Sequence, residues 1–196
     1  TGALVYGPAF LRTLWEGFPQ PTVCDGDPVV LYDHLANRWL IINFSLPNYP
    51  NGPYYMLFAV SQSDDPLGPW NRYSFKFNKL PDYPKLGVWP DGYYLSANSF
   101  SSGALKFKGP LAAVFERDSM LIGGSARMVS FQQDTSFKSM LPADLDGPPP
   151  PVGTAGLFLS VRDDAMGNDF DQLNLFQLHT DWADTSNSSF TGPLIM

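Results

Sequence analysis

Short apolar segments separated by polar turns run along the chain and predict a succession of β-strands. Residues 28–33 and 38–44 form one hairpin pattern, and residues 54–62 and 71–77 form another around a turn at residues 65–69. These four segments together predict one antiparallel, four-stranded sheet.

A second set of strands is expected to begin near residue 85. Its first two strands flank Pro90-Asp91-Gly92, whose residue types favour a tight turn. Residues 117–121 predict a helical turn within this set. The expected strands are residues 85–89, 92–99, 112–116 and 126–132.

The remaining segments are less regular. A short strand is expected at residues 3–6, near the start of the chain. Residues 156–161 and 173–180 predict strands of a third set, the second of them because its apolar and polar residues alternate. Residues 139–153 contain four successive prolines and are expected to be a loop, as is the polar segment 181–196 before its apolar tail.

The beginning of a strand unit occurs twice. A carboxylate, a proline, an apolar strand, a tight turn and an aromatic-rich strand follow one another in residues 25–42 and again in residues 82–95. Such recurring units are typical of β-propeller blades. We therefore expect an all-β fold, a β-propeller with about three to four blades, as one domain over residues 1–196. Because closed propellers have about four to eight blades, we expect this segment to be incomplete at both ends.

Composition supports this fold and argues against some functions. Nineteen prolines and seventeen glycines indicate many turns, and an aromatic content of 15% favours strands. The net charge of −7 argues against a nucleic-acid partner, which requires a basic surface. No apolar stretch is long enough to predict a membrane span. The single cysteine, Cys24, allows no disulfide within the chain.

Distinctive strings are spread over nearly the whole chain: Gly2-Ala3-Leu4-Val5, Thr13-Leu14-Trp15, residues 25–33, 82–94 and 141–147, His179-Thr180-Asp181-Trp182 and Phe190-Thr191-Gly192-Pro193. Together they resemble large secreted or surface-anchored microbial β-propeller proteins. This resemblance implies an extracellular or cell-surface location and further blades after residue 196. It implies no catalytic residues.

A second resemblance concerns the turn at residues 63–70, Ser-Asp-Asp-Pro-Leu-Gly-Pro-Trp, and the Asp-Pro pair at a strand start. Both are similar to features of five-bladed glycoside hydrolases of the arabinanase and xylosidase type. This resemblance implies glycoside hydrolysis as an alternative function.

Three aspartates occupy corresponding positions in the repeat. Asp27, Asp82 and Asp146 each precede an apolar strand that is expected to open a blade. If those strands are the innermost ones, the three carboxylates converge at one mouth of the central channel. Such a group can coordinate Ca²⁺ or flank a glycosidic bond as the acids of a hydrolase. The alternative is that each carboxylate accepts hydrogen bonds from nearby backbone N–H groups.

Other acidic residues are further candidates. Glu116 is the glutamate that could act as the catalytic acid of a hydrolase, and an ion pair is the alternative role. Asp144 and Asp146 precede Gly147 and resemble part of a calcium-binding loop. The acidic segment 163–171 could also hold Ca²⁺, with a solvated loop as the alternative.

Aromatic residues and sequons complete the candidates. Trp89 is expected to be exposed and to bind ligand together with Asp91 of the adjacent turn, stacking against a sugar, with packing between blades as the alternative. Asn43 and Asn187 each begin an N-glycosylation sequon.

The sequence as a whole favours an extracellular β-propeller module with a binding or structural role. Its expected partners are glycans, other surface proteins, or further copies of itself that associate through open blade edges. The alternative is a glycoside hydrolase with a carboxylate site at the mouth of the propeller channel.

Overall fold

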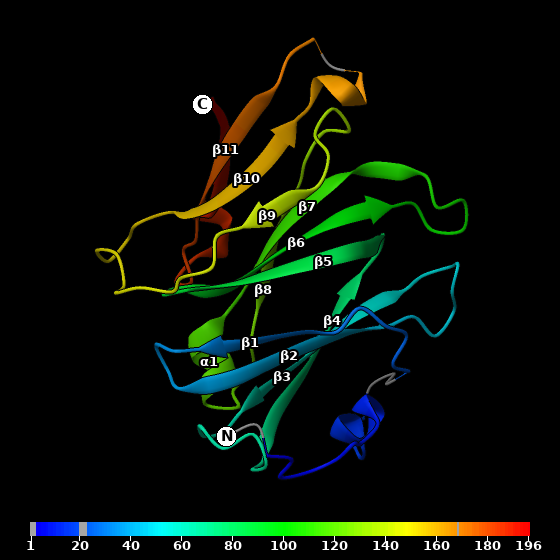
Figure 1. The fold of residues 1–196 in the computed structure, drawn as a ribbon, viewed down its shortest axis with the longest axis vertical. Helices are drawn as coiled ribbons and strands as arrows, with labels where there is room; N and C mark the ends of the chain where they lie inside the picture. The colour runs from blue at the N-terminus through cyan, green and yellow to red at the C-terminus, as the bar shows by residue number, and fades with distance from the viewer. Residues whose placement is uncertain (1–2, 20–22, 168) are drawn as a thin grey trace.

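The computed structural model describes residues 3–19, 23–167 and 169–196. In these residues the chain forms three four-stranded antiparallel sheets, which follow one another along the long axis of the molecule (Figure 1). Within each sheet, neighbouring strands are also neighbours in sequence. The all-β prediction is therefore confirmed, and none of the three sheets closes on itself.

The first sheet follows an N-terminal segment that contains the 3₁₀ helix η1, Leu11–Trp15. Residues 3–6 form no strand, so the short strand expected there is wrong. The four strands predicted for this sheet are confirmed within a residue or two. They are β1 (Val29–Asp33), β2 (Arg38–Ser45), β3 (Tyr54–Ser61) and β4 (Trp70–Phe77).

The second sheet includes the predicted helical turn, which is the short helix α1, Arg117–Leu121. Its first strand begins at Leu80, five residues earlier than expected, so that Asp82 lies inside a strand. The strands are β5 (Leu80–Trp89), β6 (Gly92–Phe100), β7 (Phe107–Phe115) and β8 (Met128–Gln132).

The third sheet contains two strands in segments that were expected to be loops. Its strands are β9 (Met140–Pro142), β10 (Gly156–Arg162), β11 (Gln172–His179) and β12 (Ser189–Ile195). The 3₁₀ helices η2 (Asp164–Met166) and η3 (Thr185–Asn187) lie in its connections. Strand β9 has only three residues and owes its pairing to β10, to which Leu141 is matched opposite Leu159.

Apolar cores join successive sheets face to face. Between the first two sheets, the Phe58 ring contacts the Phe115 ring at a centroid distance of 4.3 Å. Between the second and third, Tyr94 stacks on Phe158 at 5.6 Å. This approach requires glycine at position 156, because a Cβ there would overlap the Tyr94 ring. On the outer face of the first sheet, the N-terminal segment buries Trp15 against Leu57 and Ala59.

A buried ion pair joins the end of β1 to the second sheet. Asp33 is fully buried, and its carboxylate accepts hydrogen bonds from Arg117 Nε at 2.7 Å and Nη2 at 3.1 Å. The Tyr93 hydroxyl donates to the same carboxylate at 2.9 Å. Burial alone would lower the pKa of Arg117, but the hydrogen bonds and charge of Asp33 more than offset it, and the pKa is raised.

We expect Arg117→Met to lower the free energy of unfolding by about 3–5 kcal/mol, because it leaves the Asp33 carboxylate buried without its counter-charge. Urea denaturation followed by tryptophan fluorescence measures this loss.

Arg127→Met is the matched control. Arg127 forms an ion pair with Glu116 at 2.6 Å, but the Arg127 side chain is 47% exposed. Solvent screens such a pair, so the loss of stability is expected to be much smaller. Equal losses in the two variants would contradict a dominant role for burial.

Candidate functional site

A pocket of about 300 Å³ lies where the first and second sheets meet. Three carboxylates line it, together with one exposed tyrosine and several apolar side chains. The lining residues are Asp25, Asp27, Phe44, Leu46, Tyr49, Leu80, Asp82, Phe100 and Leu105. Two of the aspartates singled out from the repeat, Asp27 and Asp82, therefore share one pocket.

The segment before β1 is held against the end of β2. The Asp25 N–H donates to the Phe44 carbonyl at 3.2 Å, and the Phe44 N–H donates to the Gly26 carbonyl at 3.3 Å. The Asp25 carboxylate accepts a hydrogen bond from the Leu46 N–H at 2.5 Å. These contacts fix the chain just before Asp27. Asp27 itself is exposed.

An irregularity in β5 positions the second carboxylate. The pairing of β5 with β6 shifts between Asp82 and Lys85, which is the signature of a β-bulge. Tyr83, inside this bulge, has a φ of 55° and is 54% exposed. The Lys85 ammonium lies 3.7 Å from the centre of the Tyr83 ring, a cation–π contact outside the pocket lining.

Left-handed backbone conformations gather at this pocket. Of the described residues, four that are not glycine have positive φ. Asp27 (48°) and Leu105 (49°) line the pocket, and Tyr83 (55°) follows Asp82 directly. Each such conformation costs about 1–3 kcal/mol, and residues of this kind cluster at functional sites. The strain therefore marks this pocket as the leading candidate site.

Asp146 does not join the other two aspartates. The carbonyl of the next residue, Gly147, lies 3.1 Å from His34 Nε2, and His34 follows the last residue of β1. Asp27 precedes the first residue of the same strand. The expectation that all three carboxylates meet at one mouth is therefore wrong for Asp146, because the third sheet begins with β9 before this residue rather than after it.

Glu116 also lies outside the pocket lining. Its carboxylate accepts hydrogen bonds from Arg127 Nε at 2.8 Å and Nη2 at 2.6 Å. These hydrogen bonds lower the pKa of Glu116. The ion pair foreseen as its alternative role is the one that forms, and it leaves Glu116 away from Asp27 and Asp82.

Trp89 is buried, contrary to the exposed position expected for it. The residue is 8% exposed, its indole stacks on Tyr94, and its N–H donates to the Thr154 carbonyl at 3.1 Å. Asp91 accepts a hydrogen bond from the Tyr94 hydroxyl at 2.7 Å, and its carbonyl accepts one from Trp182 Nε1 at 2.6 Å. Both residues thus join the second sheet to the third, which is the alternative role foreseen for Trp89.

Among the described residues, the expected calcium ligands Asp144 and Asp146 do not belong to a group of three or more acidic, histidine or cysteine side chains that could hold a metal ion. Asp144 instead accepts a hydrogen bond from the Val88 N–H at 2.8 Å, which ties the end of β9 to β5. Asp146 is exposed. Calcium binding by Asp144 and Asp146 stays a prediction, and Ca²⁺ would need further oxygen ligands beyond these two carboxylates.

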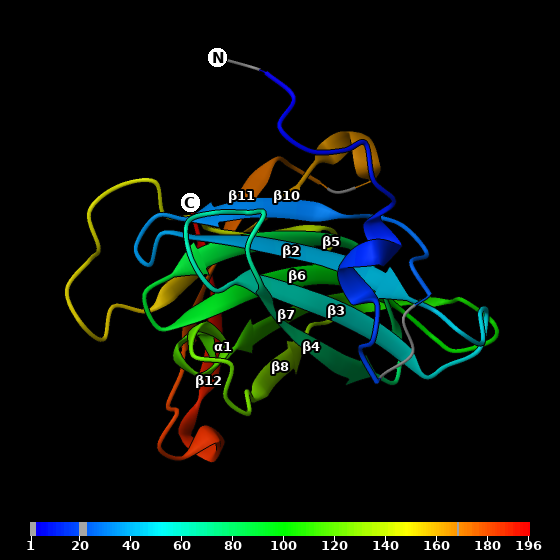
Figure 2. The same ribbon diagram turned by 90° about the horizontal axis from the view of Figure 1, so that it is seen from below.

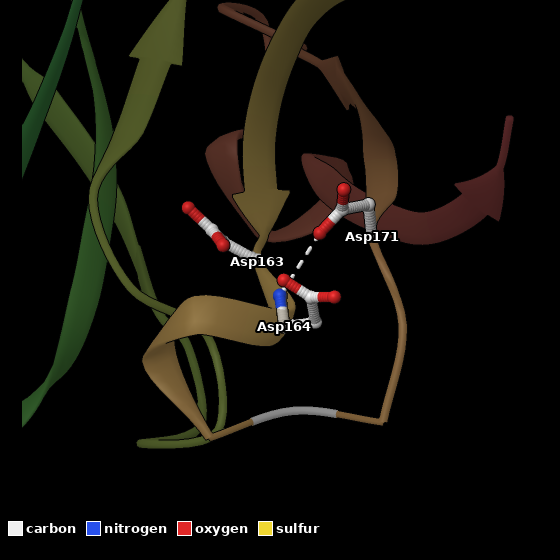
Figure 3. Close-up of side chains that lie close together, drawn as sticks. All are labelled: Asp163, Asp164 and Asp171. Atoms are coloured by element: carbon white, nitrogen blue, oxygen red, sulfur yellow. Dashed lines mark hydrogen bonds between the residues drawn. The ribbon is translucent and has the colours of Figure 1, made fainter.

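A closer group of carboxylates lies in the acidic segment between β10 and β11. Asp163, Asp164 and Asp171 offer oxygens within 4.8 Å of one another. Figure 3 shows these three side chains and the hydrogen bond between Asp164 and Asp171. Two of these carboxylates already accept hydrogen bonds from backbone N–H groups. Asp163 accepts one from the Ala165 N–H at 2.8 Å, and Asp171 accepts one from the Asp164 N–H at 2.9 Å. Calcium binding by this loop stays a prediction.

The two sequons differ sharply in accessibility. Asn43 is fully buried in β2, and its amide donates to the Phe44 carbonyl at 2.8 Å. Asn187 is exposed at the end of η3, and its amide donates to Asp181 at 3.0 Å. Only the second position leaves room for a glycan, so Asn43 is excluded as an acceptor in the folded protein.

No protein-family model, curated protein or solved structure matches this chain. In the described part of the chain, no helix is long and apolar enough to cross a membrane. The site is therefore interpreted from its own geometry.

The environment of Asp91 generates a pH prediction. Burial raises the pKa of Asp91, although the hydrogen bond from Tyr94 opposes this. The folded state then holds the proton more tightly than the unfolded state, so this residue destabilises the fold as the pH rises through its two pKa values. We expect Asp91→Asn, which keeps an acceptor for Tyr94, to be more stable than the wild type at pH 7.

The gain in stability of Asp91→Asn over the wild type should shrink as the pH falls towards the pKa of Asp in the unfolded state, about 3.9. The wild-type carboxyl group is then protonated, and so, like the asparagine side chain, it carries no charge. Urea midpoints at several pH values measure this gain. A gain that does not change with pH would contradict this origin.

Proposed function

We propose that this chain is a β-propeller segment that binds a glycan in the pocket formed by Asp25, Asp27 and Asp82. The observation that carries the proposal is the meeting of Asp27, just before the first sheet, and Asp82, in the second sheet, in one pocket with Tyr49. Carboxylate oxygens accept hydrogen bonds from sugar hydroxyl groups, and aromatic rings pack against the apolar faces of sugars.

The propeller assignment is supported by the way the sheets repeat. Each sheet is a four-stranded meander, and the first strands, β1, β5 and β9, lie beside one another in sequence order. Figure 2 shows the molecule from below, with β2 and β3 of the first sheet and β5 and β6 of the second running across the view. Radial repetition of such meanders, with first strands innermost, is the architecture of a propeller.

A glycoside hydrolase is the second candidate. It is favoured by the same pair of carboxylates, because hydrolysis of a glycosidic bond uses two acids on opposite sides of the bond. Since Glu116 pairs with Arg127, both roles would fall to the pocket aspartates.

We expect Asp27→Asn and Asp82→Asn each to weaken glycan binding by roughly tenfold or more, because each removes a charged hydrogen-bond acceptor. Asparagine adopts positive φ more readily than most residues, so the backbone at position 27 should be preserved. Retention on a glycan array that includes arabino- and xylo-oligosaccharides measures the effect.

Asp64→Asn is the matched control, since Asp64 is exposed and lies outside the pocket. Retention that is unchanged in both pocket variants would overturn the binding proposal. Release of reducing sugar from arabinan or xylan by the wild type, abolished in both pocket variants, would favour the hydrolase instead.

We further propose an extracellular or cell-surface location. For a secreted chain, the accessibility of the two sequons leads to a separate prediction. When the chain is secreted from a eukaryotic cell, we expect a glycan at Asn187 and none at Asn43. Ser189→Ala should abolish the glycosidase-sensitive mobility shift, because it removes the sequon hydroxyl, which belongs to the first residue of β12.

Ser45→Ala is the matched control, because it removes the other sequon. The Ser45 hydroxyl is buried without a hydrogen-bond partner, so its loss should not disturb the fold. A shift that depends on Ser45, or secreted protein with no glycan at all, would contradict this prediction.

A further inference from the structure

The candidate pocket carries charge of one sign. Among the described residues that line it, the charged ones are Asp25, Asp27 and Asp82, and none is a lysine, arginine or histidine. The chain as a whole has a net charge of −7, so its long-range field adds to these carboxylates rather than offsetting them. A ligand that enters the pocket therefore meets a negative potential.

Two of the three carboxylates are not engaged by the protein. The Asp25 carboxylate accepts a hydrogen bond from the Leu46 N–H at 2.5 Å. Between described residues, no hydrogen bond or ion pair engages the carboxylate of Asp27 or that of Asp82. Asp27 is exposed and Asp82 is partly buried. Both can therefore accept hydrogen bonds from a ligand without first giving up a partner in the protein.

The lysines that are closest to Asp82 in sequence have other partners. Lys79 Nζ donates to Gln132 Oε1 at 2.8 Å. The Lys85 ammonium lies 3.7 Å from the centre of the Tyr83 ring. Neither lysine belongs to the pocket lining. Neither ammonium group therefore supplies the counter-charge of the two unengaged carboxylates.

The spacing and size of the pocket indicate a ligand that is larger than a single ion. Among the described residues, its three aspartates do not form a group whose carboxylate oxygens all lie within 4.8 Å of one another. The pocket volume of about 300 Å³ lies at the lower end of the range for small-molecule sites, about 300–1,000 Å³. Apolar side chains, among them Phe44 and Phe100, and the ring of Tyr49 complete the lining. These dimensions suit one sugar ring.

We infer that the pocket selects glycans with a free amine, that is, unacetylated hexosamines, whose ammonium group lies between Asp27 and Asp82. The inference rests on the glycan-binding function proposed above and names the class of glycan. An ammonium group offers three N–H donors and a positive charge. Hydrogen bonds between ammonium and carboxylate groups are shorter and stronger than those between neutral groups.

The same carboxylates disfavour other glycans. A hydroxyl group in place of the amine can donate a hydrogen bond, but the attraction between opposite charges is lost. Acetylation converts the amine into a neutral amide, with the same loss of charge. A sugar carboxylate or sulfate is repelled by the pocket, and such repulsion of wrong ligands contributes to specificity.

Isothermal titration calorimetry with three trisaccharides of the same linkage tests the inference. They are built from glucosamine, glucose and N-acetylglucosamine, so the corresponding carbon of each ring carries an amine, a hydroxyl or an acetylated amine. We expect the glucosamine trisaccharide to bind about tenfold more tightly than either of the others at physiological ionic strength. Asp27→Asn and Asp82→Asn should each reduce this preference to about threefold or less, because each removes one of the two charges.

Asp64→Asn is the matched control, because it changes the net charge by the same amount at an exposed position outside the pocket. It should leave the preference unchanged. This comparison separates recognition in the pocket from the general attraction of a cation to an acidic protein, which salt screens. Circular dichroism checks that each variant is folded.

Three results would overturn the inference. The first is equal affinity for the three trisaccharides, which leaves the proposed glycan binding intact if the pocket variants still weaken it. The second is a preference for the amine that persists in folded Asp27→Asn and Asp82→Asn proteins, or that Asp64→Asn reduces as strongly. The third is no binding of the glucosamine trisaccharide. The proposed function itself fails only if the glycan array also shows no retention that depends on the pocket.

Discussion

The buried ion pair between Asp33 and Arg117 sets the arrangement on which the candidate site depends. Asp33 ends β1, while Asp27, two residues before β1, lines the pocket at the other end of that strand. Arg117 and Tyr93, which both bind the Asp33 carboxylate, belong to the second sheet or its helix. Fixing one end of a short strand against the second sheet also fixes the other end. The ion pair thereby determines where Asp27 lies relative to Asp82.

At the junction between the second and third sheets, the partly buried carboxylate has no cation as its hydrogen-bond partner. Asp91 follows β5 as Asp33 ends β1, but its partners are the Tyr94 hydroxyl and, through its carbonyl, the Trp182 indole. A carboxylate buried among neutral donors is poorly stabilised in its charged form, which is why its pKa is raised. The first junction is therefore held by a buried ion pair. The second is held by stacked rings, by the hydrogen bonds of Asp91, and by Arg127, which donates to the Trp182 carbonyl at 2.6 Å.

The sequence predicted the regular parts of the fold because they follow local rules. Alternation and turn residues located the first sheet within a residue or two, and the repeat identified Asp27 and Asp82. Strand β9 could not be foreseen, since a three-residue strand exists only through its pairing with β10. Nothing in the sequence around Arg117 indicated that its partner is Asp33, which is 84 residues away. The burial of Trp89 was missed for the same reason, because the third sheet covers it.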